Sequence, residues 1–116
     1  MKEVSDMLFK YFTELEVFKK EMKDRLYPIY VSEQKVFPLA VYNIGEVPYV
    51  SKDARSFPVT LSLCYAPENY SAAMVFADEM KEAVDNFPNG EYLSTQTIFD
   101  DENEYIYINI NFNVIQ

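Results

Sequence analysis

Carboxylates are the side chains that lie close enough together in this sequence to suggest chemistry. Four of them fall at helical spacing within one segment: Asp78, Glu79, Glu82 and Asp85. Residues three and four apart share one side of a helix, so the set could act as a paired acid/base site or bind a divalent metal. Neither an apolar pocket nor a third type of ligand accompanies them, and a solvated helix face is therefore the preferred interpretation.

A second acidic group forms the segment DDENE, which contains Asp100, Asp101, Glu102 and Glu104. Loose calcium binding is one interpretation of these oxygens, and the sequence leaves it open. The segment nevertheless lacks the alternating ligand positions and the central glycine of an EF-hand loop. A charged hairpin tip is the better interpretation, and we expect no metal and no cofactor.

The residues that most enzymes use for catalysis are missing or isolated. The chain has no histidine, which removes the usual general base, the commonest zinc ligand and the histidine-activated nucleophiles. It has only two glycines, so no glycine-rich phosphate loop can be written. The single Cys64 is interpreted as a small, half-buried structural side chain in a reducing compartment. We therefore predict that the protein is not an enzyme.

The net charge of −9 originates in one segment. Between Pro67 and Glu104 the sequence holds ten acidic residues and one basic residue, Lys81, whereas the remainder is balanced. Such a density of carboxylates repels phosphate backbones and attracts basic partners over a screening length of about 8 Å. We expect no sequence-specific binding of nucleic acid. No run approaches the ~20 apolar residues of a membrane span, so we also expect no membrane association and a cytoplasmic location.

Apolar periodicity predicts two amphipathic helices. Apolar residues recur at helical spacing from Val4 to Leu26, which predicts a first helix that ends before Pro28. The same spacing from Ala73 to Phe87 predicts a second helix, capped by a polar side chain just before or within its first turn, Asn69 or Ser71.

Four or five strands are predicted between and after these helices. Val36 to Gly45 is apolar on both parities, which favours a strand covered on both faces, with an optional short strand at Ile29 to Val31. FPVTLSLCY alternates strictly, and the strands Tyr92 to Phe99 and Tyr105 to Gln116 form a hairpin through DDENE. We predict a single α+β domain over residues 1–116, in the order α-β-β-α-β-β. Its sheet is mostly antiparallel, with both helices on one face.

The other face of this sheet is predicted to carry no charge. In YIYININFNVIQ the even-numbered residues from Ile106 to Val114 are apolar and belong to the core, whereas the odd-numbered residues from Tyr105 to Asn113 are tyrosine and asparagine. Solvated sheet faces usually collect lysine and glutamate, whereas interface centres lose charge and gain tyrosine. A wetted face would look similar, because these residues favour strands in any case. We favour a subunit interface, and we name this surface the uncharged face; its residues are Thr60, Ser62, Cys64, Tyr105, Tyr107, Asn109, Asn111 and Asn113.

The segment RLYPIYVSEQKVFPLAVYNIG resembles the start of the phage tail-terminator, or tail-completion, family of siphophage-like tails and prophages. The similarity lies in a helix that leads into Arg25-Leu26-Tyr27-Pro28, in a strand that opens on Pro38, and in the order of elements. The resemblance implies a non-catalytic structural subunit of the virion tail. Such a subunit forms a ring, usually six-fold, that ends the tail tube and contacts the tail tube protein and the head-completion protein.

An alternative from another class is a monomeric acidic binding module. In that interpretation residues 67–104 capture a basic partner, as an inhibitor or a nucleic-acid mimic would. The two hypotheses differ in their response to salt, because charge-driven binding weakens with ionic strength and contacts through an uncharged surface do not.

Overall fold

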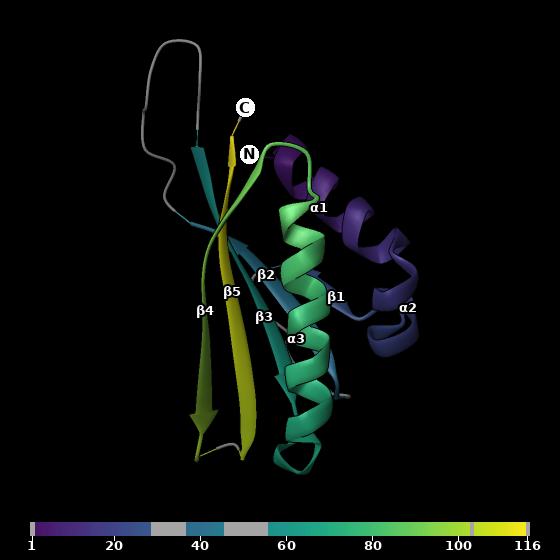
Figure 1. The fold of residues 1–116 in the computed structure, drawn as a ribbon, viewed down its shortest axis with the longest axis vertical. Coiled ribbons are helices and arrows are strands. Elements are labelled where there is room, and N and C mark those ends of the chain that lie inside the picture. The colour runs from purple at the N-terminus through teal and green to yellow at the C-terminus, as the bar shows by residue number, and fades with distance from the viewer. Residues whose placement is uncertain (1, 29–36, 46–55, 103, 116) are drawn as a thin grey trace.

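The computed structural model describes residues 2–28, 37–45, 56–102 and 104–115. Three α-helices lie on one face of a five-stranded sheet (Figure 1). The helices are α1 (Lys2–Glu14), α2 (Glu16–Met22) and α3 (Tyr70–Asp85), and a short 3-10 helix, η1 (Pro67–Asn69), precedes α3. The strands are β1 (Leu26–Pro28), β2 (Leu39–Ile44), β3 (Ser56–Tyr65), β4 (Gly90–Asp100) and β5 (Tyr105–Ile115).

The strands are ordered β1-β2-β3-β5-β4 across the sheet. β1 pairs with β2 in parallel, and the other three pairings are antiparallel. An α+β fold with a mostly antiparallel sheet and helices on one face is thereby confirmed. The number and order of elements differ from the prediction, because the first helical segment forms two helices and a short strand follows them directly.

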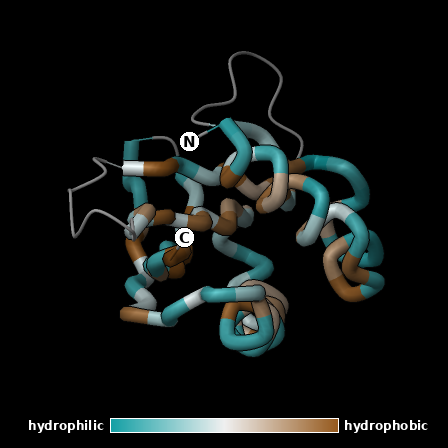
Figure 2. The backbone as a smooth tube through the Cα atoms, turned by 90° about the horizontal axis from the view of Figure 1, so that it is seen from above, coloured by the Kyte–Doolittle hydropathy of each residue, from teal (hydrophilic) through white to brown (hydrophobic). Residues whose placement is uncertain are grey.

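The main core lies between the helices and the sheet. Seen from above, α3 and the α1–α2 pair occupy separate places on the same side of the strands (Figure 2). The even-numbered residues of β5 from Ile106 to Val114 are all buried, together with the odd-numbered residues of β3 from Phe57 to Leu63. Each such side chain contributes roughly 1.5–3 kcal/mol on burial. The predicted core rows of both strands are therefore confirmed.

The first helix was predicted to be continuous, and this prediction is wrong at Leu15. Leu15 is extended, with φ −70° and ψ 130°, and it separates α1 from α2. The apolar stripe continues across the break because Phe12 and Phe18 on either side are both fully buried. α2 ends at Met22, before Lys23 with its positive φ of 59°. Pro28 accordingly lies in β1 and does not end a helix.

The other element predictions are met in part. β2 is covered on both faces as expected, since Ala40 and Tyr42 join the main core while Leu39 packs on the opposite side. The predicted short strand Ile29–Val31, and Val36 at the start of the longer one, lie outside the described residues. Asn69 does occupy the N-cap position of α3, but its side chain makes no capping hydrogen bond there.

A β-bulge divides β4 into two parts with opposite parity. Its register against β5 shifts between Tyr92 and Ser94, so that Leu93 is an extra residue without a partner in the ladder. Beyond the bulge, Thr95 pairs with Ile110 and Ser94 pairs with Asn111. Odd-numbered residues of β4 from Thr95 onward therefore lie on the helix side of the sheet, and even-numbered residues lie on the uncharged face.

Candidate interface on the uncharged face

The sheet register brings the predicted interface residues together on one surface. Thr60 pairs with Asn111, Ser62 with Asn109 and Cys64 with Tyr107. Because cross-strand partners point to the same side of a sheet, all of them lie opposite the helices. The alternation in β3 and β5 was sufficient to place these residues, including Tyr105 and Asn113, on one face.

One half of this face is a ladder of short hydrogen bonds across three strands. The Thr60 hydroxyl donates to Asn111 Oδ1 at 2.8 Å, and the Ser62 hydroxyl donates to Asn109 Oδ1 at 2.6 Å. On the other side Asn111 Nδ2 donates to the Ser94 hydroxyl at 3.2 Å. These polar atoms satisfy one another within the sheet. Covering them by another surface therefore costs less desolvation than covering charged or unsatisfied groups would.

The other half of the face is a small second core, which the sequence interpretation missed. Cys64, predicted to be half-buried, and Tyr105, predicted to be open to a partner, are only 4% and 7% exposed. They pack with Leu39, which is itself 3% exposed. The Phe37 ring covers Tyr105 at a centroid distance of 5.2 Å. The apolar residues on the second parity of β2 were the available signal for this cluster.

A tyrosine pair and one carboxylate mark the end of the face nearest the hairpin. The Tyr107 hydroxyl donates to the Tyr105 hydroxyl at 2.7 Å and has an Asp100 carboxylate oxygen at 3.3 Å. Burial, followed by the Tyr105 hydrogen bond and the Asp100 charge, raises the pKa of Tyr107 well above the ordinary tyrosine value. The Tyr107 hydroxyl therefore remains a neutral hydrogen-bonding group at physiological pH. Asp100 is half-buried here, so the face carries one acidic group at this end.

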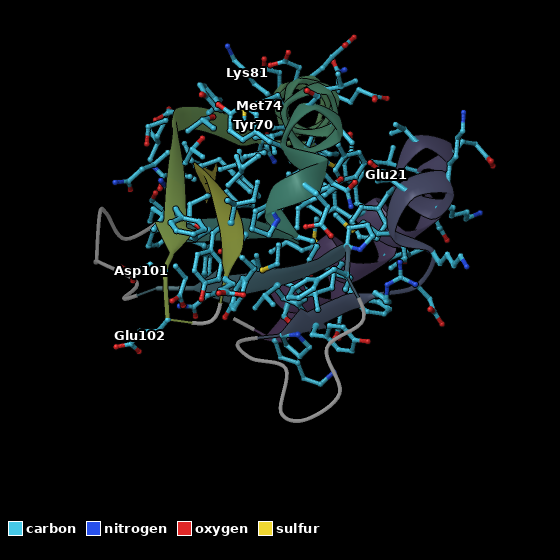
Figure 3. The ribbon with its side chains drawn as sticks, turned by 90° about the horizontal axis from the view of Figure 1, so that it is seen from below. Glu21, Tyr70, Met74, Lys81, Asp101 and Glu102 are labelled. Atoms are coloured by element: carbon cyan, nitrogen blue, oxygen red, sulfur yellow. The ribbon has the colours of Figure 1, made fainter. Side chains whose placement is uncertain are left out.

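The predicted acidic patch is distributed over two separate places. Asp78, Glu79, Glu82 and Asp85 are all exposed on α3, whereas Asp101, Glu102 and Glu104 are exposed at the tip of the β4–β5 hairpin. Figure 3 shows Asp101 and Glu102 at the hairpin tip, far from α3, where Tyr70, Met74 and Lys81 are labelled. The Lys81 amine lies 4.9 Å from the centre of the Tyr92 ring. Within the described ranges, no three His, Cys, Asp or Glu side chains form a group that could hold a metal ion.

A groove of about 320 Å³ lies between α2 and α3. Its charged residues are Lys20, Glu21 and Glu79. Glu21 accepts a hydrogen bond of 2.8 Å from the hydroxyl of Tyr65, which rises from β3 beneath the helices. Burial, followed by this bond, raises the pKa of Tyr65 far above the ordinary value. Glu21 therefore anchors α2 to the sheet.

The fold of this chain is similar to that of a protein of known structure. A chain in the virion of a native gene transfer agent particle superposes with a TM-score of 0.70 at 10% sequence identity. The alignment covers 93% of this chain and 90% of that chain. No protein-family model matches the sequence, and no curated protein matches it either. The two chains therefore share an architecture over nearly their whole lengths.

The helices were also compared with the requirements of a membrane span. In the part of the chain that the structure describes, none of them is both long and apolar enough to cross a bilayer.

Proposed function

We propose that this protein is a structural assembly component of a phage-like or prophage tail. In this proposal it forms a ring that terminates the tail tube and joins the tube to the head-completion protein, and it catalyses no reaction. The observation that carries the proposal is the likeness, over 93% of this chain, to a chain from a gene transfer agent virion. The order of elements and the Arg25-to-Pro38 segment, which resemble tail terminators, agree with it.

The uncharged face is our candidate for one of the two ring surfaces. A subunit that closes a ring needs two different complementary surfaces, because each copy meets its neighbours head to tail. The ladder of Thr60, Ser62, Asn109 and Asn111 is neutral and internally hydrogen-bonded. The half-buried Tyr107 at its end supplies part of the rigid, amphipathic contact area that interface centres favour. The exposed carboxylates of α3 would then remain outside the contact, or on the wall of a channel that repels DNA.

The ring is tested by two substitutions on the uncharged face, Tyr107→Glu and Asn109→Lys. We expect each to dissociate a ring formed by the parent protein, alone or on added tail tubes, because it buries an unpaired charge. Light scattering over a range of concentrations, with negative-stain imaging of the same samples, measures assembly. Circular dichroism verifies that each variant is folded.

Matched controls place the same charges on the far side of the molecule. Val75→Glu and Glu82→Lys alter exposed positions of α3 and should leave assembly unchanged. Assembly that survives both face variants would exclude the uncharged face as a ring surface. A protein that stays monomeric with tail tubes present, and that binds a basic partner less tightly as salt rises, would support the acidic binding module instead.

A further inference from the structure

The outer edge of β4 is a long strand edge that, among the residues described by the structure, has little protection beyond the bulge at Leu93. β4 is the last strand of the sheet, and the eight residues Tyr92 to Phe99 contain no charge, proline or glycine. Three of its apolar side chains are strongly exposed: Leu93 at 50%, Ile98 at 37% and Phe99 at 56%. Natural proteins usually blunt such edges with charge, proline or short length, because an open edge accepts another strand.

The opposite edge of the same sheet is closed. The Arg25 carbonyl accepts the Ala40 N–H at 2.9 Å, so the backbone of Leu26 and Pro28 points away from β2. The Leu26 N–H donates a hydrogen bond to the Asp24 carbonyl at 2.9 Å, and Pro28 has no N–H. β1 therefore presents no outward donor for a further strand. A sheet that continues from β4 of one copy to β1 of the next is thereby disfavoured.

The backbone groups that β4 offers can be assigned from the ladder. The Asn89 carbonyl accepts the Ile115 N–H at 3.0 Å, so odd-numbered residues of β5 point their backbone toward β4. Ser94, Gln96 and Ile98 pair with these odd-numbered residues and bond to β5. Their neighbours consequently direct N–H and C=O groups outward, away from the sheet; these neighbours are Thr95, Thr97 and Phe99.

Charge determines which strand fits this edge. Glu91 precedes the uncharged stretch, and Asp100, Asp101 and Glu102 follow it. Antiparallel pairing of two β4 strands centred on Gln96 would set Thr95 of one copy against Thr97 of the other and Glu91 against Asp101, and like charges across strands are destabilising. A complementary strand has an uncharged middle and basic ends.

We propose that the free edge of β4 binds an extended segment of a different protein, uncharged in its middle and flanked by lysine or arginine, as a sixth strand of the sheet. Backbone hydrogen bonds to Thr95, Thr97 and Phe99 hold the segment, and the carboxylates at both ends of β4 select its basic flanks. This binding mode goes beyond the proposed ring and does not require it, since the ring surface lies on a face of the sheet and not at this edge.

The probe is a synthetic peptide of about eight alternating threonines and valines, a usual strand length, with two lysines at each end. A second peptide carries glutamates in place of the lysines. At low salt, we expect the lysine peptide to bind at least about ten-fold more tightly than the glutamate peptide. Fluorescence anisotropy measures both affinities. Amide exchange followed by NMR should show new protection at Thr95, Thr97 and Phe99. Equal affinity of the two peptides, or protection confined to another element, would overturn the proposal.

A backbone variant tests the edge itself. Thr97→Pro removes an outward N–H and leaves the bonds between β4 and β5 in place, since proline is tolerated on the open side of an edge strand. The Thr97→Pro protein should bind the lysine peptide at least about ten-fold more weakly than the parent does. The Thr97→Val protein should bind it with the affinity of the parent. Unchanged binding by a folded Thr97→Pro protein would contradict the proposal, as would a dimer formed by pairing of β4 with β4. The exchange measurement on the parent protein decides the question without any variant.

Discussion

Gly90, the first residue of β4, follows the turn after α3 and has less room for a side chain than Gly45. A Cβ atom there would lie 2.9 Å from the Val84 carbonyl oxygen and 3.1 Å from that of Phe87. Both are backbone atoms at the end of the helix, so they cannot move aside as a flexible side chain would. The Phe87 carbonyl also accepts the Gly90 N–H at 2.9 Å.

We expect Gly90→Ala to lower the free energy of unfolding by about 1–3 kcal/mol, the usual cost of overpacking. Gly45→Ala is the matched control, because its Cβ would meet Pro58 Cγ at 3.5 Å, an ordinary contact. That change should stay within about 0.5 kcal/mol of the parent. Urea denaturation of the two variants measures the difference. Equal stabilities would show that the backbone after α3 shifts to accommodate the added Cβ atom.

Tyr65 makes the stability of the fold sensitive to alkaline pH. Its pKa is raised by burial and by Glu21, so the folded state holds the phenolic proton more tightly than the unfolded chain does. The stability that results is complete below the unfolded pKa of about 10 and is lost as pH rises above it. The raised pKa values of Tyr11 and Tyr107 act in the same direction.

Tyr65→Phe should be less stable than the parent by about 1–2 kcal/mol near pH 8, because it loses the bond to Glu21. Between about pH 9 and 11 its unfolding free energy should fall less steeply than that of the parent, since one shifted group is gone. Denaturation series at several pH values measure both slopes. If the unfolding free energies of the parent and the variant fall equally steeply with pH, the pKa of Tyr65 does not change on unfolding.

At the scale of elements, β4 is expected to exchange its amide protons in an alternating pattern. The amides of Ser94, Gln96 and Ile98 are bonded to β5, whereas those of Thr95, Thr97 and Phe99 point outward. Hydrogen exchange followed by NMR should therefore find the second set faster, because only the first set requires opening of the ladder. Uniformly slow exchange would mean that the edge is covered, and uniformly fast exchange would mean that β4 frays from the sheet.

The elements that the sequence predicted best are those with an unbroken period. The rows Ile106 to Val114 and Phe57 to Leu63 lie where alternation places them, because one side of each strand is buried. The break at Leu15 could not be seen, since Leu15 itself packs against the core and the apolar stripe does not falter. β1 was missed for a similar reason, because a strand of three residues leaves no period to detect.

The same limits apply to the candidate site. Alternation predicted which residues share the uncharged face, but the pairs Thr60–Asn111 and Ser62–Asn109 depend on a register that is set by pairing across the chain. The burial of Tyr105 depends partly on the Phe37 ring, which lies just before β2 although the predicted strand Val36 to Gly45 included it. Long-range packing therefore changed an apparently uniform polar face into a polar ladder beside a small core.

At the scale of the whole molecule, the two faces of the sheet differ from each other, and so do its two edges. One face is covered by helices, and the other is uncharged along the middle of its ladder. Within the described ranges, β1 presents no outward N–H donor at one edge, whereas β4 presents such donors at the other. The exposed carboxylates of α3 and those of the hairpin tip lie on separate elements, and neither group belongs to the Thr60–Asn111 and Ser62–Asn109 ladder. Because these surfaces are separate, the proposed ring contact and the proposed strand at the β4 edge do not compete for the same surface.

The bulge at Leu93 has a consequence for how the length of this chain can vary among relatives. Elsewhere in the sheet, loss or gain of one residue inside a strand would turn every following side chain to the opposite face. Leu93 has no partner in the ladder, so its deletion would join Tyr92 to Ser94 in regular alternation and leave every other side chain on its present face. Position 93 is therefore where homologous sequences should differ by a single-residue gap while preserving the fold.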